Sequence, residues 1–444
     1  MTAAVASEVK PFEALPLVQL PETFESDLPQ WTARMAAELG PIFRVRYSGD
    51  HVPVYMVGPE ANRFVLFNGR EHFSHEAGWT PIIGTILGRG ILNMDGAEHN
   101  RDRKTMNPAF TIAYMARYLP AMVSVIRART ADWAARGEVD LFEETRRITF
   151  DVAAEALIGL DRGEEVDLLR RDFMALIYGN FDPPPTTHEE YLAAIGPIRK
   201  ELDDLLLSRI AERRARPTDD VLGLLVQARD EAGQPLSDQQ LLGHVNILLV
   251  AGHETSTTMS SWLLYLLASH PEYLARVRAE LDELLGPDPD APITLDAVKG
   301  MRVLGNALTE AGRLYAPVVN GPRGVAKAFD FGGYHVPAGE QVRYSIAAGH
   351  LLPSVFADPE RFDPDRFAAP REEDKKTPYG LVTFGGGPRI CIGVNFAQVE
   401  IKALAAHVLR RFDLEVVPGQ QIRQIYAPTI GAPTDGIRMR VTGR

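Results

Sequence analysis

The sequence predicts a mainly α-helical fold with a minor β portion, built as a single domain. Apolar residues recur at helical spacing through most of residues 90–320. One segment within that region, residues 241–269, is long, apolar and almost free of charge. Strand-like alternation is confined to about residues 40–70 and to the region after about residue 320. No repeat or low-complexity tract interrupts the chain, so we expect one domain over residues 1–444.

The expected β portion has two parts. Residues 43–65 alternate apolar and polar side chains around a turn at Gly49 and Asp50, which predicts a β-hairpin in an N-terminal β-rich part. Residues 323–346 and 422–443 are short strand-like pieces separated by turns. We expect these pieces to form C-terminal strands, with a cysteine-containing loop between them.

The helical core is expected to contain one helix much longer than the others. Amphipathic spacing predicts helices over residues 122–136, 148–160, 189–216 and 271–285. Residues 237–240, SDQQ, form a capping-box pattern, and Pro271 starts the next helix. The helix between them has about 32 residues and, at roughly 1.5 Å each, a length of about 48 Å.

The apolar character of residues 241–269 raises the alternative of a membrane helix. Glu254 is the only formal charge in this segment, but Asn246 and His253 also lie near its centre, where polar groups are costly in lipid. A helix buried on all sides in a large core fits these residues better.

Composition excludes several classes of function. The 444 residues carry a formal net charge of −12, so nucleic acid and anionic membrane have no electrostatic support as partners. The single cysteine, Cys391, excludes an internal disulfide and a four-cysteine iron–sulfur cluster. The N-terminus has no apolar run of signal-peptide or anchor length. We therefore expect a cytoplasmic protein with no membrane anchor.

The only thiol lies in an unusual loop, FGGGPRICIG, at residues 384–393. Glycines let the backbone approach a bulky flat partner and direct amides toward the sulfur of Cys391. The helix expected to start near Gly393 adds its positive end. A lone cysteine is usually a small buried hydrophobe. In this loop we favour a metal-ligating thiolate instead.

The middle of the long helix, AGHETS at residues 251–256, is the second candidate site. Gly252 costs about 1 kcal/mol relative to alanine in a helix interior, which suggests that something packs close to its backbone. Glu254 and Thr255 place an acid and an alcohol in apolar surroundings, where they can relay protons. The alternative is a buried polar cluster satisfied by neighbouring helices, and the segment alone leaves both open.

Three further charged patterns are commonplace when taken alone. Glu310 and Arg313 are three residues apart on a helical face, as in a solvated ion pair. His99 and Arg103 are four residues apart, as on an exposed helical face, and Arg366 follows a Pro-Asp pair. Their joint occurrence and fixed order carry the information.

These motifs together resemble the cytochrome P450 family of haem-thiolate monooxygenases. Residues 384–393 match the family pattern F-x-x-G-x-R/H-x-C-x-G at every position, and AGHETS matches A/G-G-x-D/E-T-T/S. Glu310 and Arg313 match the ExxR motif, and Arg366 stands where the third member of that triad belongs. The matches run from about residue 90 to 440 in the family order.

The resemblance implies haem b between the long helix and the helix after the cysteine loop, with O2 as co-substrate. Cys391 is then the axial iron ligand, and Thr255 and Glu254 organise water and deliver protons during oxygen activation. The other implied cofactor-binding residues are His99, Arg103, Arg323 and Arg389 at the haem propionates, together with Gly252, Phe384 and Gly393. Glu310, Arg313 and Arg366 are implied to be structural.

The resemblance also places candidates for an apolar substrate pocket, each of which is equally compatible with ordinary core packing. They come from the segment before His99, the long helix, the chain after the ExxR helix and the final turn. The candidates are Trp79, Ile82, Ile83, Ile86, Leu248, Ala251, Val318, Val319, Thr429 and Ile430. Residues 182–187 are implied to belong to a mobile lid.

The implied reaction is hydroxylation of a lipophilic small molecule by a monomeric enzyme. The chain is too short to include a reductase, so electrons are expected from a separate ferredoxin or flavodoxin with its reductase. Soluble bacterial members frequently have a histidine where this chain has Arg389. The Gly-Pro-Arg version of the loop is more similar to family branches that oxidise fatty acids, retinoids or sterols. A peroxide-driven peroxygenase or haem isomerase, and a non-catalytic haem carrier or gas sensor, are the alternatives.

Overall fold

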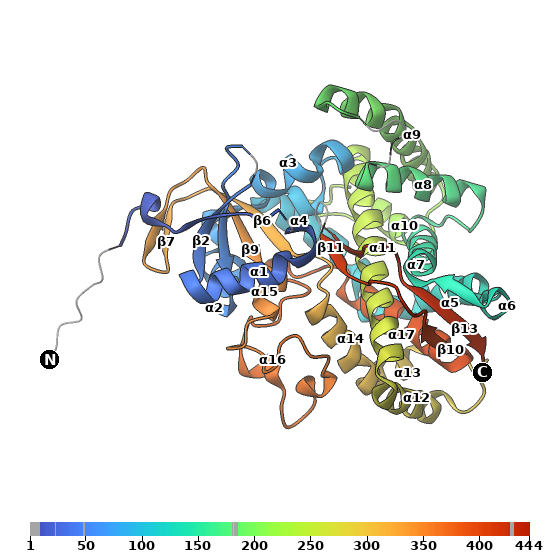
Figure 1. Ribbon diagram of the computed structural model, residues 1–444. Helices are drawn as coiled ribbons and strands as arrows, with labels where there is room; N and C mark the ends of the chain where they lie inside the picture. Colours follow the sequence, from blue (N-terminus) through green and yellow to red (C-terminus); the bar gives the residue numbers. More distant parts are fainter. Residues whose placement is uncertain (1–8, 23, 48, 180, 182–184, 427–429) are drawn as a thin grey trace. The chain divides into compact units, whose positions relative to one another are not determined.

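The structure, a computed structural model, describes residues 9–22, 24–47, 49–179, 181, 185–426 and 430–444. The chain divides into two compact units, each made of two stretches of sequence. Unit 1 is Met1–Ile82 with Val318–Cys391, and unit 2 is Ile83–Pro317 with Ile392–Arg444. Most of the described chain is helical and the sheets are small (Figure 1).

Unit 1 is organised by a six-stranded mixed sheet with the order β1-β2-β3-β9-β6-β4. Its strands are β1 (Leu17–Gln19), β2 (Ile42–Arg46), β3 (Val54–Val57), β4 (Phe73–Ser74), β6 (Asn320–Val325) and β9 (Gln341–Ser345). Strands β7 (Phe329–Phe331) and β8 (Tyr334–Val336) form a separate antiparallel pair. The main helices are α1 (Phe24–Leu39), α2 (Pro59–Arg63), α15 (Ile346–His350) and α16 (Glu373–Lys376).

The predicted N-terminal hairpin is confirmed as the antiparallel pair β2–β3, in which Ile42 lies opposite Met56. Its second strand ends earlier than residue 65, because Gly58 adopts φ 99° and Pro59 begins α2. Proline fits the first turn of a helix, where its missing N–H has no partner to lose. The predicted second strand therefore included residues that belong to α2.

Unit 2 is a helical assembly around α11 (Asp238–Ser269). Helices α7 (Leu141–Ile158) and α17 (Val394–Arg411) pack along it (Figure 1). The other main helices are α4 (Gly96–Met106), α5 (Ile112–Thr130), α6 (Trp133–Arg136), α8 (Glu164–Tyr178), α9 (His188–Ala215), α10 (Val221–Gln227), α12 (Pro271–Leu285), α13 (Leu295–Gly300) and α14 (Arg302–Leu314). Helix α3 (His75–Leu87) crosses from unit 1 into unit 2.

Two small sheets complete unit 2. Strands β10 (Phe412–Val416), β13 (Arg438–Gly443) and β5 (Glu138–Asp140) form an antiparallel sheet in that order. Strands β11 (Gln424–Tyr426) and β12 (Gly431–Pro433) form a hairpin. The C-terminal strands predicted after residue 422 are therefore present.

The long helix is confirmed with the predicted ends. Ser237 accepts a hydrogen bond from the Gln240 amide, in a complete capping box, and the helix runs 32 residues to Ser269. Within the described residues, no single helix is long and apolar enough to cross a membrane. Residues 96–110 and 112–136, which meet at a bend of 57°, have together the length and apolar composition of a membrane span. Helix α11 is thus a buried core helix, as its polar centre predicted.

One predicted helix is interrupted. The segment 122–136 is divided between α5, which ends at Thr130, and α6, which starts at Trp133.

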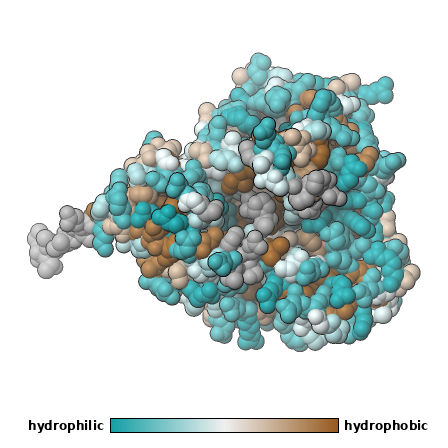
Figure 2. Space-filling model, turned by 45° about the horizontal axis from the view of Figure 1, so that its top comes forward, coloured by the Kyte–Doolittle hydropathy of each residue, from teal (hydrophilic) through white to brown (hydrophobic). Residues whose placement is uncertain are grey.

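The face of the molecule in Figure 2 is largely hydrophilic, with hydrophobic side chains in separate patches. A single domain over residues 1–444 stays a prediction.

Candidate functional site

The cysteine loop in unit 1 needs its glycines for backbone reasons. Gly385 and Gly387 have φ of 73° and 60°, in the left-handed region that other residues rarely adopt. A Cβ atom on Gly387 would also lie 2.3 Å from the carbonyl oxygen of Leu66. The Cys391 amide donates to the carbonyl of Phe384 at 2.9 Å, which closes the loop. The backbone that lies close to Gly387 is therefore that of Leu66, a part of the same chain, and not a separate partner.

The cysteine of this loop is not part of the buried core. Cys391 is exposed, although a free cysteine is among the residue types most often buried. Helix α17 begins at Val394 with Gly393 as its N-cap, three residues after the cysteine. A helix N-terminus stabilises nearby negative charge and so favours the thiolate.

Two predicted propionate residues lie in unit 1. Arg323, only 4% exposed, sits in β6 with its guanidinium over the ring of Tyr344 and donates to the carbonyl of Pro322 at 2.7 Å. Arg389 is half-buried in the 3-10 turn Gly387–Arg389. Gly78 of α3 packs against Arg323, because a Cβ there would lie 2.6 Å from the Arg323 Cα.

Arg366, the predicted structural arginine, is fully buried in unit 1. It donates to Glu373 at 2.8 Å and to the carbonyl of Ala357 at 3.0 Å. Glu373 also accepts from Arg371, which donates in turn to Asp363 at 2.7 Å. Sequence reasoning missed these partners, since acids and arginines are common in that polar segment.

In unit 2, α11 has one stripe that differs from the rest of its surface. Ala251 is exposed and Gly252 and Thr255 are half-buried, whereas most of the helix is buried. Leu248 is buried, but the spacing 248, 251, 252, 255 places it on the same helical face as these three. The Thr255 hydroxyl donates to the carbonyl of Ala251 at 2.7 Å.

Nothing in the described chain requires a glycine at position 252. A Cβ there would meet only Leu157, at an ordinary contact distance of 3.7 Å. Glycine at this position destabilises the helix by about 1 kcal/mol relative to alanine, and the neighbouring side chains leave room for a Cβ atom. This fits a bulky partner that is not part of the polypeptide.

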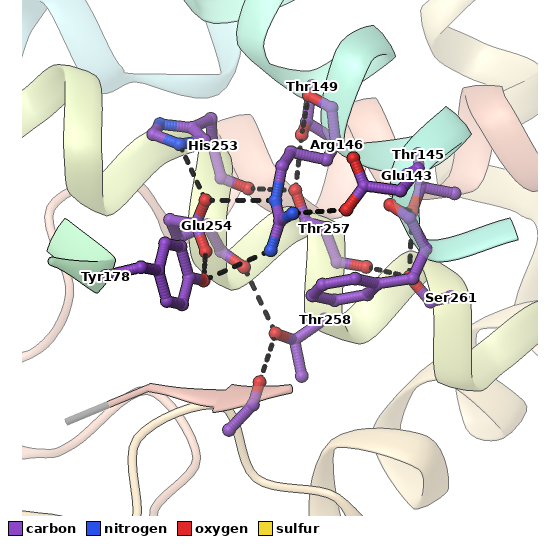
Figure 3. Close-up of polar contacts among 12 residues, drawn as sticks. Glu143, Thr145, Arg146, Thr149, Tyr178, His253, Glu254, Thr257, Thr258 and Ser261 are labelled. Carbon is purple, nitrogen blue, oxygen red and sulfur yellow. Dashed lines mark hydrogen bonds and ion pairs between the residues drawn. The ribbon is translucent and has the colours of Figure 1, made fainter. Parts of the chain in front are cut away.

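Glu254, next to Thr255, points in a different direction. Its carboxylate is fully buried among residues of α7, α8 and α11 (Figure 3). Tyr178 donates a hydrogen bond to it, the Nε2 atom of His253 lies 2.9 Å away, and the Nε atom of Arg146 lies 3.5 Å away. The buried polar cluster, left open as an alternative, is thus present.

The charge state of Glu254 follows from these neighbours. Burial alone would raise the pKa of Glu254, but the charges of His253 and Arg146 and the hydrogen bonds outweigh burial and lower it. Burial and the nearby carboxylate raise the pKa of Tyr178, so the phenol remains a donor. Glu254 is therefore an anion fixed by three partners. The sequence gives no local signal for Arg146 or Tyr178, which lie far from Glu254 along the chain.

Glu310 and Arg313 do not form the solvated pair that their spacing suggested. Both are 0% exposed on α14, and the guanidinium donates two hydrogen bonds of 2.7 and 2.8 Å to the carboxylate. Such a buried bidentate pair is structural, because removing one partner strands the other charge in the core.

The remaining predicted cofactor residues lie on α4 in unit 2. His99 is buried, with its Nδ1 3.2 Å from the Asn100 side chain. Arg103 donates to the side chain of Asn107 at 3.0 Å. Their spacing of four puts both on one face of α4, as predicted.

The predicted pocket residues are partly buried. Trp79, Ile83, Leu248 and Val319 are buried, Ile82, Ile86, Val318 and Ile430 are half-buried, and Ala251 is exposed. Thr429 and residues 182–184 lie outside the described residues. A hollow at the edge of the six-stranded sheet, near Arg44 and His51, contains none of the candidates.

Comparison with known proteins decides the family. A cytochrome P450 family model matches residues 10–441. The chain belongs to the cytochrome P450 family. This P450 is 33% identical over 409 residues to a putative cytochrome P450 120 of Synechocystis sp., covering 91% of this chain and 90% of the relative. It is 29% identical over 405 residues to a sterol 14alpha-demethylase of Mycolicibacterium vanbaalenii, covering 89% and 88%.

A solved structure agrees with the family. Retinoic acid-bound cyanobacterial CYP120A1 has a TM-score of 0.84 with this P450 at 30% identity, covering 97% of this chain and 100% of that one. P450s are generally monooxygenases that use haem b and O2. Each unit has residues whose chemistry fits such a group: unit 1 has the exposed Cys391 thiol, and unit 2 has Gly252, a helix glycine that its own neighbours do not require.

Proposed function

We propose that this P450 hydroxylates a lipophilic small molecule with O2, using electrons from a separate ferredoxin or flavodoxin and its reductase. The observation that carries the proposal is the stripe on α11, which presents the Thr255 hydroxyl from an otherwise buried helix. A protein that only stores haem has no need of an alcohol at this position. A peroxygenase also has no need of proton delivery to O2.

The proposed roles follow the chemistry of each side chain. Cys391 would supply the thiolate ligand to the iron, and the start of α17 would stabilise its negative charge. His99, Arg103, Arg323 and Arg389 hold the two propionates by charge-assisted hydrogen bonds. Thiolate-ligated haem, when bound, activates O2 for insertion of one oxygen atom into a C–H bond.

Thr255 and Glu254 would handle the protons that this reaction consumes. The Thr255 hydroxyl, now donating to Ala251, can turn to hold a water on the exposed stripe. Glu254 is ionised and held by Tyr178, Arg146 and His253, so it must leave one of these partners and take up a proton from solvent before it can pass that proton toward Thr255.

The substrate class is proposed from the pocket candidates and the relatives. The candidates are apolar apart from Thr429 and Trp79, as suits a lipophilic molecule. Retinoic acid is bound in one similar structure and a sterol demethylase is among the relatives, so retinoids, sterols and fatty acids are the first molecules to test. We also propose that the protein is a cytoplasmic monomer.

The absorption spectrum of the dithionite-reduced, carbon monoxide-bound protein tests the proposal. A Soret band near the strongly red-shifted position of thiolate haem is expected, and Cys391→Ser should remove that shift while the fold persists. A globin-like band in the wild-type protein would contradict the assignment of Cys391. Turnover with peroxide but none with reduced ferredoxin and O2 would favour the peroxygenase instead.

A further inference from the structure

The chain between α3 and α4 crosses α11 at unusually close range. A Cβ atom on Gly243 would lie 1.8 Å from the carbonyl oxygen of Arg89, and a Cβ on Gly90 would lie 2.6 Å from the carbonyl oxygen of Gly243. Only glycine permits this backbone contact at either position. Residues 88–93 are therefore seated directly on the first half of α11.

The residue after that crossing, His244, uses both of its ring nitrogens. The amide of Ile91 donates to His244 Nδ1 at 3.0 Å, and His244 Nε2 lies 3.1 Å from Asp102 Oδ2. An amide can only donate, so Nδ1 must be unprotonated and the neutral ring carries its proton on Nε2. His244 and Asp102 are both 0% exposed.

Asp102 connects the same imidazole to α4. It also accepts from Arg101 at 2.8 Å, and Gln240 of α11 approaches it at 3.4 Å. On α4, Asp102 is flanked by His99 and Arg103, the proposed propionate residues. A displacement of Asp102 therefore moves the helix that carries them.

The loop is rigid on its own side as well. Asn93 accepts from the amide of Gly90 at 2.9 Å and donates to the carbonyl of Gly88 at 3.1 Å. Arg89 makes a two-bond ion pair with Glu98 of α4. These bonds tie the loop to itself and to α4, and the Ile91 amide links it to His244.

We propose that His244 is a positioning residue that fixes two parts of the P450 site to α11. Through Ile91 it sets the end of the substrate segment that contains Ile83 and Ile86. Through Asp102 it sets the position of α4 and its propionate residues. The inference rests on the proposed haem-thiolate function, and it assigns each of these effects to a different ring nitrogen.

Two variants distinguish the role of His244 Nδ1 from that of Nε2. In His244→Asn, the side-chain oxygen reaches the position of Nδ1 and keeps an acceptor for Ile91, but nothing reaches Asp102. In His244→Gln, the longer side chain reaches Asp102 and the acceptor for Ile91 is lost. His270→Gln, at the end of the same helix, is the matched control, because its ring contacts the carbonyl of Leu266 instead of this loop.

The experiment uses the haem-loaded protein and four measurements: hydrogen exchange, spectral titration with each of two ligands, and the rate of haem loss to apomyoglobin. Hydrogen exchange of residues 86–95 reports the Ile91 link, and spectral titration with all-trans retinoic acid reports the substrate segment. Imidazole binds the iron directly and serves as the reference ligand. His244→Gln should speed hydrogen exchange at the Ile91 amide. It should also lower the affinity for retinoic acid about tenfold, which is the effect of one lost buried hydrogen bond. The affinity for imidazole should be nearly unchanged.

The second variant gives the opposite pattern. His244→Asn should keep slow exchange at Ile91 but lose haem faster to apomyoglobin. His270→Gln should match the wild type in all four measurements. Equal changes in both ligand affinities in both variants, or no change in either, would overturn the positioning role. If the wild-type protein lacks the red-shifted carbon monoxide band, the proposed function fails instead, and exchange at Ile91 still reports the hydrogen bond.

Discussion

At the scale of single residues, one step along α11 separates two environments. Successive helical residues are rotated by about 100°, so Thr255 lies on the exposed stripe while Glu254 points into the buried cluster. The sequence predicted that both polar residues are special, because they interrupt an apolar helix. It did not predict that they face apart, since the direction depends on which helices cover each face.

Replacement of Thr255 by alanine should leave the carbon monoxide spectrum intact and lower coupling. The hydroxyl is lost from the stripe while the fold keeps its contacts, so electrons should leave as hydrogen peroxide. We expect product per NADPH to fall by about tenfold or more, in line with the loss of one proton-transfer group. Paired product and peroxide assays would measure this.

Matched variants sharpen the test of Thr255. Thr255→Ser keeps a hydroxyl and should retain most of the coupling. Thr257→Val removes a buried hydroxyl that bonds Thr149 at 2.7 Å, two residues farther along α11. Thr257→Val should lower the melting temperature of the protein without raising the amount of hydrogen peroxide that it forms. Normal coupling in Thr255→Ala would refute the role of this hydroxyl.

At the scale of elements, the cluster around Glu254 links three helices. Arg146 belongs to α7 and Tyr178 ends α8, and both meet the Glu254 side chain of α11 (Figure 3). Glu143 of α7 also accepts from Arg146, which stacks over the rings of Phe142 and Tyr178. The position of the C-terminal end of α8 is therefore coupled to the acid beside Thr255.

Removal of Arg146 should destabilise the protein and make Glu254 easier to protonate. In Arg146→Leu the carboxylate stays buried with one fewer cation, a change that typically costs about 3–5 kcal/mol. The lowered pKa of Glu254 gives the wild type stability that is present above about pH 4.5 and is lost as pH falls through the folded-state pKa. Urea unfolding from pH 7 to pH 4 should show a smaller acid loss in the variant.

The comparison variant for this cluster is Tyr178→Phe. It removes one hydrogen bond and keeps the Arg146 guanidinium, so its cost should be about 1–3 kcal/mol. If Arg146→Leu is no less stable than Tyr178→Phe, the guanidinium does not stabilise the buried acid.

The sequence predicted elements whose signals are local. Helix α11 was placed correctly because its capping box and Pro271 are next to its ends. Strand β5 was missed, since its three residues pair with β13 about 300 positions later and have no periodic signal of their own. The same limit applies to the site: the cysteine loop is a local motif, whereas the partners of Glu254 and Arg366 come from distant or polar segments.

At the scale of the whole molecule, two buried groups on α17 give stability opposite dependences on pH. Burial, with the charges of Arg127 and Arg410, lowers the pKa of His407 to about 4 from 6.5. Burial raises the pKa of Glu400 to about 8 from 4.5, although the Ser256 hydroxyl acts against this rise. His407 is thus neutral and Glu400 protonated in the folded protein near pH 7.

His407 makes folding weaker in acid. Its ring contacts the Thr130 hydroxyl at 3.0 Å between α17 and α5. The unfolded chain binds a proton at this position below about pH 6.5 and the folded one does not, so stability falls by up to about 1.4 kcal/mol per pH unit as pH drops toward 4. His407→Gln should remove this contribution, so that in urea titrations the stability of the variant rises as pH drops from 6.5 toward 5. A pH dependence unchanged from the wild type would exclude the neutral buried ring.

Glu400 acts in the other direction, because the folded state holds a proton that the unfolded chain releases above about pH 4.5. Between about pH 4.5 and 6.5 the two effects oppose each other, and above pH 6.5 only Glu400 remains. Wild-type stability should therefore fall by up to about 2 kcal/mol from pH 6.5 to 8, whereas Glu400→Gln should lose this fall. His407→Gln should show the Glu400 slope already from pH 5. A wild-type protein equally stable at pH 6.5 and 8 would mean that Glu400 is ionised inside the fold.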